Sequence, residues 1–252
     1  MTIASTPPTP PTPPTQPMSS PIPPALLPPG GQRLLVIMAH PDDAEFICGG
    51  TIARLSAEGW KVSYVLVTSG NRGSHEAGMT MERLGKIREE EQRDAAAVLG
   101  VRDVTFLGYN DGEVEVTLSL RKELAFAIRR ARPDVLFTFD PWRPYEIHPD
   151  HRNVGLCALD ALAAARMPMY YPDQLSADFS EHRIRQVYLF STGQPNHWVD
   201  IDNYMEKKLE ALHCHKSQVS AEVDEIIRQR ARLIGVEHGY TYGESFHHLA
   251  LR

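Results

Sequence analysis

Cysteine is scarce in this chain, and its cysteines do not stand at the spacing of a zinc ribbon or a redox pair. The 252 residues contain three, Cys48, Cys157 and Cys214. An odd number without CxxC spacing argues against both a disulfide framework and a cysteine zinc site. We therefore expect all three to be small apolar side chains in a protein of the reducing cytoplasm.

Long hydrophobic runs and an excess of positive charge are also missing. No apolar stretch reaches the ~18 residues that a membrane-spanning helix needs, so we expect no membrane span. The formal net charge is −6 and the isoelectric point about 6.0, without a basic stripe, which argues against nucleic acid as a partner. The dinucleotide fingerprint G-x-G-x-x-G is absent as well, and this argues against a nicotinamide-dependent oxidoreductase.

Proline, by contrast, is concentrated at one end of the chain. Residues 1–29 hold 12 of the 20 prolines and almost no charge. Such a segment cannot bury a hydrophobic core, so residues 1–30 are predicted to form a disordered or polyproline-like tail. The segment lacks the basic start and apolar centre of a secretory signal. Residues 31–252 are long enough for one α/β domain.

Apolar runs of strand length alternate with helical patterns through this domain. The predicted strands are Arg33–Ala39, Val62–Thr68, Val104–Leu107, Pro133–Phe139 and Gln186–Ser191. The predicted helices are Ala44–Glu58, Met81–Leu99, Leu118–Arg130, His151–Ala165 and Tyr204–His215. Because the strands are apolar throughout, we expect a Rossmann-like, mainly parallel sheet with helices on both faces. Sheets of this kind bind ligands beyond the carboxyl ends of their strands.

The first strand ends at an unusual group of polar residues, in the stretch "LLVIMAHPDDAEFICGGTI" from Leu34 to Ile52. Proline at the start of a helix and acids in its first turn are ordinary helix-start features, so His-Pro-Asp-Asp taken alone allows a purely structural role. The spacing of three between His40 and Asp43, however, places both side chains on one side of a helical first turn.

A second stretch, "DVLFTFDPWRPYEIHPDHRNVG", repeats this layout and ends in His148-Pro149-Asp150-His151. Because parallel strands have their carboxyl ends at one edge of the sheet, the two motifs are expected to converge. A His and an Asp from the first motif and a His from the second make three ligands, which is typical of catalytic zinc. Asp42 would then lie where it can accept a proton from a bound water, and the cation would offset the repulsion between the two carboxylates.

These motifs resemble those of the LmbE/PIG-L family of zinc-dependent de-N-acetylases. The matching segments span Leu34 to Gln218 and read "AHPDDAE", "GGTIA", "VTSGNRG", "IREEEQRDAAAVLGV", "FLGYNDGE", "HPDHR" and "KLEALHCHKSQ". The resemblance implies an LmbE-like fold and a hydrolase acting on a linear amide C–N bond. Its substrate would be an N-acetylglucosamine-containing small molecule, and its products acetate and a free amine.

The resemblance also implies roles for individual residues. The metal ligands would be His40, Asp43 and His151. Asp42 would be the general base, and His148 would stabilise or protonate the tetrahedral intermediate, with Asp150 orienting its ring. Amide hydrolysis needs each of these parts, because it requires an activated water, a base for its proton and positive character beside the developing oxyanion.

The residues that would contact the substrate are less clearly marked. Arg88 and Asp111 fall where the family contacts sugar hydroxyls, although Arg88 could be a helix-surface charge and Asp111 a turn residue. Asn71 and Arg72 lie in a glycine-bracketed loop at the same sheet edge, and we expect them to contact the head group.

Three further positions leave alternatives open. Glu146 stands where other members carry a tyrosine that polarises the carbonyl, so the oxyanion partner is open. His197 and His215 either approach the site late in the chain or are structural residues.

Two broader questions stay open at the level of sequence. The main alternative to an enzyme is a non-catalytic metal-binding or scaffold member of the same fold, recruited through the proline-rich tail; the presence of Asp42 beside the ligands favours the enzyme.

An N/O ligand set suits Fe²⁺ or Mn²⁺ as well as Zn²⁺. Neither the exact substrate nor the formation of a homo-oligomer can be read from the residues.

Overall fold

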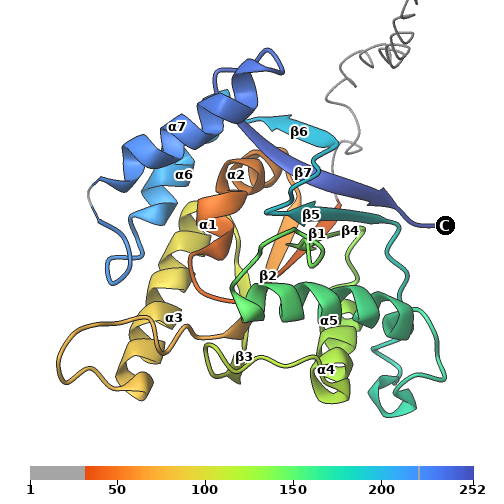
Figure 1. Cartoon of the computed structure of the whole chain (residues 1–252). Coiled ribbons are helices and arrows are strands. Elements are labelled where there is room, and N and C mark those ends of the chain that lie inside the picture. The colour runs from red at the N-terminus through yellow and green to blue at the C-terminus, as the bar shows by residue number, and fades with distance from the viewer. Residues whose placement is uncertain (1–31, 221) are drawn as a thin grey trace, which may run out of the picture.

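A twisted, mostly parallel sheet runs through the centre of the computed structural model, which describes residues 32–220 and 222–252 (Figure 1). Within these residues the strand order is β3-β2-β1-β4-β5-β7-β6. The strands are β1 Arg33–Met38, β2 Lys61–Thr68, β3 Asp103–Tyr109, β4 Val135–Phe139, β5 Gln186–Phe190, β6 His197–Asp200 and β7 Gly243–Ala250. Strands β1 to β5 pair in parallel, and β7 runs antiparallel to both β5 and β6. The predicted proline-rich tail lies outside the described residues.

Helices cover both faces of the sheet. They are α1 Asp43–Ile47, α2 Gly49–Ala57, α3 Met81–Val98, α4 Leu118–Ala131, α5 Pro149–Ala165, α6 Met205–Leu212 and α7 Val223–Val236, with 3-10 turns at Pro172–Gln174 and Asp202–Tyr204. Helices α4 and α5 pack together on one face, α6 packs with α1, α2 and α3 on the other, and α7 lies along β7 (Figure 1). The predicted single α/β domain is confirmed. None of the helices in the described part of the chain has the length and hydrophobicity that a membrane crossing requires.

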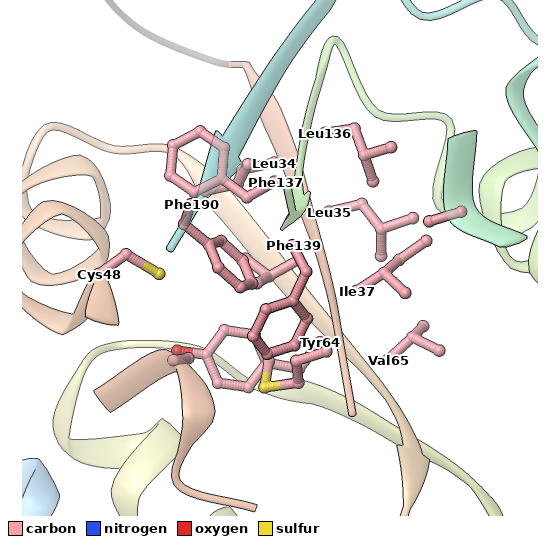
Figure 2. Packing of buried hydrophobic residues seen from close by; sticks show 14 of the residues in the cluster. Leu34, Leu35, Ile37, Cys48, Tyr64, Val65, Leu136, Phe137, Phe139 and Phe190 are labelled. Carbon is pink, nitrogen blue, oxygen red and sulfur yellow. The ribbon is translucent and has the colours of Figure 1, made fainter. Parts of the chain in front are cut away.

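The central strands are apolar throughout because both of their faces are buried. Successive side chains of a strand point to opposite faces of the sheet. Phe137 and Phe139 of β4 therefore pack beside Tyr64 on one face, whereas Leu35 and Ile37 of β1 lie on the other (Figure 2). All of these side chains are essentially inaccessible to solvent. This explains why the strands lack the alternation of polar and apolar residues that a half-exposed sheet would show.

The helix predicted over residues 44–58 is in fact two helices, which break at Cys48 (φ −134°). The break leaves the first N–H groups of α2 free, and those of Gly50 and Thr51 donate to the Glu244 carboxylate at 3.0 and 2.7 Å. Lys208 Nζ lies 2.6 Å from the same carboxylate. A buried carboxylate at a helix N-terminus, paired with a buried cation, is the reason for the second helix start.

The last part of the domain departs most from the sequence-based expectation. Strands β6 and β7 and helix α7 were not predicted, because β6 has only four residues and β7 mixes histidines with apolar side chains. His197 lies on β6, where its ring packs against Tyr188 and His248, with centroids 5.0 and 6.1 Å away.

The order of the strands determines where the two His-Pro-Asp motifs meet. From β1 the chain builds the sheet outward to β2 and β3, and then returns to add β4 on the other side of β1. Such a reversal of strand order leaves a crevice at the carboxyl ends of the two central strands. Because β1 and β4 are adjacent and in parallel register, the segments that follow them emerge side by side.

Candidate active site

Asp43 is the residue at which the two motifs meet. Its Oδ2 accepts hydrogen bonds from the backbone N–H groups of Ala39 and His40, at 3.1 and 2.7 Å, which fix the carboxylate at the end of β1. The same oxygen lies 3.7 Å from Nδ1 of His40, and Oδ1 lies 3.3 Å from Nε2 of His151. The three side chains predicted as metal ligands are therefore brought together.

The second ring nitrogen of His40 faces two further carboxylates. Its Nε2 lies 3.1 Å from Oδ2 of Asp150 and 3.1 Å from Oδ1 of Asp111. Asp150 is fully buried and accepts hydrogen bonds from the N–H groups of Gly112 and Val114, at 2.7 and 3.2 Å. The sequence predicted that Asp150 orients the His148 ring; in the structure the Asp150 carboxylate contacts His40 instead and is held there by the loop after β3.

His148 contacts both of the other imidazoles, which are themselves 5.3 Å apart between ring centroids. Its ring stacks on that of His151, with centroids 4.5 Å apart, and meets His40 edge-on at 4.6 Å. Its Nδ1 is buried without a hydrogen-bond partner among the described residues. The potential ligand atoms of His40, His148 and His151 lie within 4.8 Å of one another, as do those of His40, Asp111 and Asp150. The rings and carboxylates thus form one compact cluster of nitrogen and oxygen donors.

Asp42 adopts a left-handed backbone conformation (φ 90°), which side chains other than glycine rarely take. Its N–H donates to Oε1 of Gln92 at 2.9 Å, and its Oδ2 accepts from Arg88 at 3.1 Å. Asp42 makes no capping hydrogen bond to α1, contrary to a purely helix-start role. Burial raises the pKa of the Asp42 carboxyl, and the Arg88 guanidinium opposes this rise.

Arg88, predicted to contact a sugar, lies beneath Asp42 and is only 4% exposed. Its guanidinium donates to the carbonyls of Pro41 and Gly70, at 2.7 and 2.8 Å, as well as to Asp42. Gly70 has φ 59°, and Arg88 occupies the space that a Cβ at this position would need. Arg88 therefore ties the loops after β1 and β2 together underneath the carboxylate.

The other predicted substrate-binding residues line the loops around this cluster. Asn71 accepts a hydrogen bond from the N–H of Asp111 at 3.0 Å and donates to Asn110 at 3.0 Å. Arg72 forms an ion pair with Glu113 at the exposed edge of the same loop. Asn71 thus braces the loop whose Asp111 carboxylate faces His40.

A fully buried polar network behind Asp42 was not predicted. Gln92, which accepts from the Asp42 N–H, donates to Glu45 Oε1 at 3.0 Å. The other oxygen of Glu45 lies 3.3 Å from Nε2 of His215. Burial alone would lower the pKa of His215, but the contact with Glu45 raises it. His215 therefore reaches this network rather than the imidazole cluster, and in sequence Glu45 resembles any acid in a first helical turn.

The electrostatics of the cluster favour a bound cation. Burial alone would lower the pKa of His40, but Asp111, Asp150 and Asp43 raise it to about 11. Burial would likewise raise the pKa of Asp43, yet His151 and His40 hold it well below its usual range. A divalent cation would satisfy the same demand for positive charge. His40 and His151 each turn one ring nitrogen toward Asp43. A set of two imidazoles and one carboxylate fits Zn²⁺ or a similar ion.

Comparison with known families matches the part of the chain that carries both motifs. The family described as PIG-L, GlcNAc-PI de-N-acetylase, matches residues 35–162. The chain belongs to this family. The segment runs from the first residues of β1 into α5, and it therefore contains every residue of the cluster described above.

Individual members of the PIG-L family cover most of the chain. A diacetylchitobiose deacetylase of Thermococcus kodakarensis is 36% identical over 215 residues, which are 85% of this chain and 80% of the relative. A probable N-acetyl-alpha-D-glucosaminyl L-malate deacetylase of Bacillus anthracis is 30% identical and covers 79% of this chain and 86% of its own. The structure of an N,N'-diacetylchitobiose deacetylase from Pyrococcus horikoshii, in complex with an inhibitor, superposes with a TM-score of 0.83 at 34% identity. It covers 87% of this chain and 84% of the other.

Proposed function

We propose that this protein hydrolyses the N-acetyl amide of an N-acetylglucosamine-containing small molecule and releases acetate and a free amine. The observation that carries the proposal is the placement of Asp42 beside Asp43. The Asp43 carboxylate contacts two imidazoles, whereas the Asp42 carboxylate pairs with Arg88 and the Asp42 N–H donates to Gln92. The relatives named for deacetylation of acetylated amino sugars support the same chemistry.

We infer that His40, Asp43 and His151 hold a divalent cation, zinc in the first instance and Fe²⁺ or Mn²⁺ as alternatives. The contacts of Asp43 with both imidazoles support this choice. A cation bound there supplies Lewis acidity that activates water near neutral pH and polarises an amide carbonyl. Asp150 then serves to orient His40, because a carboxylate behind a ligand histidine fixes its ring and tautomer.

The remaining residues of the cluster divide the proton transfers between them. Asp42 accepts the proton of the attacking water, whose oxygen forms the new bond to the acetyl carbon. His148 donates a hydrogen bond beside the developing oxyanion, and the buried Nδ1 without a partner supports this role. As the C–N bond breaks, the amine nitrogen takes up the proton that Asp42 accepted from the water, and acetate leaves. Asp111, Asn71 and Arg72 line the loops that would contact the sugar.

The scaffold alternative has less support. A protein that only bound a metal would have no need for a second carboxylate held in a left-handed conformation by two separate side chains. The proline-rich tail through which such a scaffold would be recruited lies outside the described residues.

We also propose a location in the reducing cytoplasm. The support is that Cys48, Cys157 and Cys214 are all free thiols, and that Cys48 and Cys157 are buried.

The decisive experiment measures release of primary amine from a panel of N-acetylated sugars, together with the metal content of the same preparation. The panel contains N-acetylglucosamine, N,N'-diacetylchitobiose and an N-acetylglucosaminyl inositol, so that it separates a free sugar, a disaccharide and a small glycoside. We expect turnover of at least one, abolished by a chelator and restored by Zn²⁺. Metal-loaded protein that releases no amine from any of them would support the scaffold alternative instead.

A further inference from the structure

Glu146 occupies a defined position behind His151. Its Oε1 lies 3.6 Å from Nδ1 of His151 and accepts a hydrogen bond from the backbone N–H of His148 at 3.2 Å. Its Oε2 lies 3.0 Å from Arg143, which also donates to the Ser191 hydroxyl, at 2.6 Å, just beyond the end of β5. The Glu146 side chain is 11% exposed. The carboxylate is therefore held in place from two sides.

The arrangement around His151 parallels that around His40. In each case one ring nitrogen faces the Asp43 carboxylate, and the opposite nitrogen faces a second carboxylate that accepts from backbone N–H. Asp150 plays this part for His40, with N–H groups of the loop after β3. A histidine that binds a metal almost always donates its other ring N–H to such a group, which fixes the ring and raises its basicity as a ligand.

We propose that Glu146 is a positioning residue for the metal ligand His151, and that Arg143 holds the Glu146 carboxylate in register with the ring. This gives Glu146 a task different from that of the tyrosine that other family members carry at this position, because Glu146 faces the ring nitrogen of His151 that points away from Asp43. The inference rests on the proposed metal site, and it adds a residue whose effect is on the cation rather than on the substrate.

A purely structural role predicts a different outcome. An Arg–Glu pair with one exposed partner, like Arg143 and Glu146, contributes little to folding stability, because solvent screens the attraction between the charges. If Glu146 acted only through this pair, its loss would lower the thermal midpoint slightly and leave metal affinity unchanged. If it positions His151, its loss weakens metal binding while the metal-free protein melts as before.

The test measures the Zn²⁺ dissociation constant by chelator competition at one pH, together with the visible absorption spectrum of the Co²⁺-loaded protein. Parent, Glu146→Gln and Arg143→Gln are compared with Glu58→Gln, which removes the carboxylate of the Arg54–Glu58 surface pair. We expect Glu146→Gln to weaken Zn²⁺ binding about 10–100-fold and to shift the Co²⁺ bands. Arg143→Gln should act in the same direction by a smaller factor, and Glu58→Gln should match the parent.

Parent-like affinity and spectrum in Glu146→Gln would overturn the proposal. If Glu146→Gln does not fold, Arg143→Gln is the deciding variant, because it keeps the Glu146 carboxylate but removes the guanidinium that holds it. An unchanged Zn²⁺ dissociation constant in Arg143→Gln would also overturn the inference. A parent protein that binds neither Zn²⁺ nor Co²⁺ would instead refute the proposed metal site itself. Metal binding is measured without turnover, so a failure to find the substrate does not affect the result.

Discussion

Asp42 combines an unfavourable backbone conformation with the contacts that maintain it. A left-handed residue other than glycine costs on the order of 1–3 kcal/mol unless its surroundings hold it in place. Here Gln92 accepts from the Asp42 N–H, while Arg88 binds both the carboxylate and the preceding carbonyl. The cost is understandable if the carboxylate must lie beside the metal site without joining it.

The replacement Asp42→Asn tests the role of Asp42 as general base independently of its role in folding. Asparagine also tolerates the left-handed region and retains the shape of the side chain, so the protein should fold and bind its metal. Turnover should fall by roughly the 10²–10⁴-fold that general-base catalysis supplies. Amine release and metal content of the purified variant test this, and normal turnover would reduce Asp42 to a conformational role.

His148 is predicted to act mainly in the transition state. His148→Ala should lower kcat far more than it raises KM, because its hydrogen bond strengthens as the oxyanion develops. Metal affinity should change little, since Asp43 contacts His40 and His151 directly. Steady-state kinetics and a metal titration check both statements. Loss of the metal from this variant would show that His148 is itself a ligand.

The burial of His197, which lies outside the active site, leads us to expect that folding stability depends on pH. Burial and the neighbouring His248 lower the pKa of His197 from its ordinary value of 6.5 to about 4. The folded state binds this proton less readily than the unfolded chain does. The free energy of unfolding is therefore unaffected by the titration of His197 above about pH 6.5 and decreases as the pH falls from 6.5 toward 4.

The matched variant is His197→Gln, which does not titrate. Urea unfolding at pH 7.5 and 5.0 should show a larger loss of unfolding free energy in the parent, by on the order of 1–2 kcal/mol after allowance for partial exposure of the ring. Equal losses in the two proteins would contradict the assignment.

At the scale of elements, the packing of α2 against the segment that precedes α6 depends on a close approach that only glycine allows. A Cβ at Gly50 would lie 2.8 Å from Cδ1 of Ile201. In α3, by contrast, a Cβ at Gly85 would meet Asn71 Cβ at 3.4 Å, an ordinary van der Waals distance. Both glycines are helical, so the two sites differ mainly in the space around them.

This contrast predicts opposite effects of one substitution. Gly50→Ala should destabilise the protein by about 1–3 kcal/mol through overpacking against Ile201. Gly85→Ala should be neutral or stabilising by up to about 1 kcal/mol, because alanine is the better helix former. Thermal unfolding of both variants measures the difference. An equally stable Gly50→Ala would mean that α6 and its preceding turn move freely relative to α2.

At the scale of the whole molecule, the proline-rich tail is predicted to be dispensable. A segment with so few apolar side chains has little to dock on the domain, so deletion of residues 1–29 should change neither the thermal midpoint nor the turnover. Differential scanning fluorimetry and the amine-release assay on the truncated chain test this. A fall in either quantity would indicate that the tail packs on the domain or over the site.

The α/β architecture and the residue types of the site could be predicted from the chain because both depend on local patterns. A strand buried on both faces is apolar at every position, and a helix repeats its apolar positions every three or four residues. One His-Pro-Asp motif follows its strand directly and the other follows after a short loop, so parallel pairing predicts that the two motifs converge. The choice of His151 as the ligand from the second motif came from the family resemblance.

The partners of these residues were decided only by tertiary structure. Asp150 lies 110 positions from the His40 ring that it contacts, Gln92 lies 50 positions from Asp42, and Glu244 lies 193 positions from the Thr51 N–H group that it accepts from. A local pattern reports which residues share a helix face or a strand face, but it contains no information on which distant loop supplies a donor or an acceptor. Those pairings follow from the strand order, which places β7 near α2, and from the packing of α3 and the loop after β3 beside the segment that follows β1. They therefore form only when the whole chain is folded.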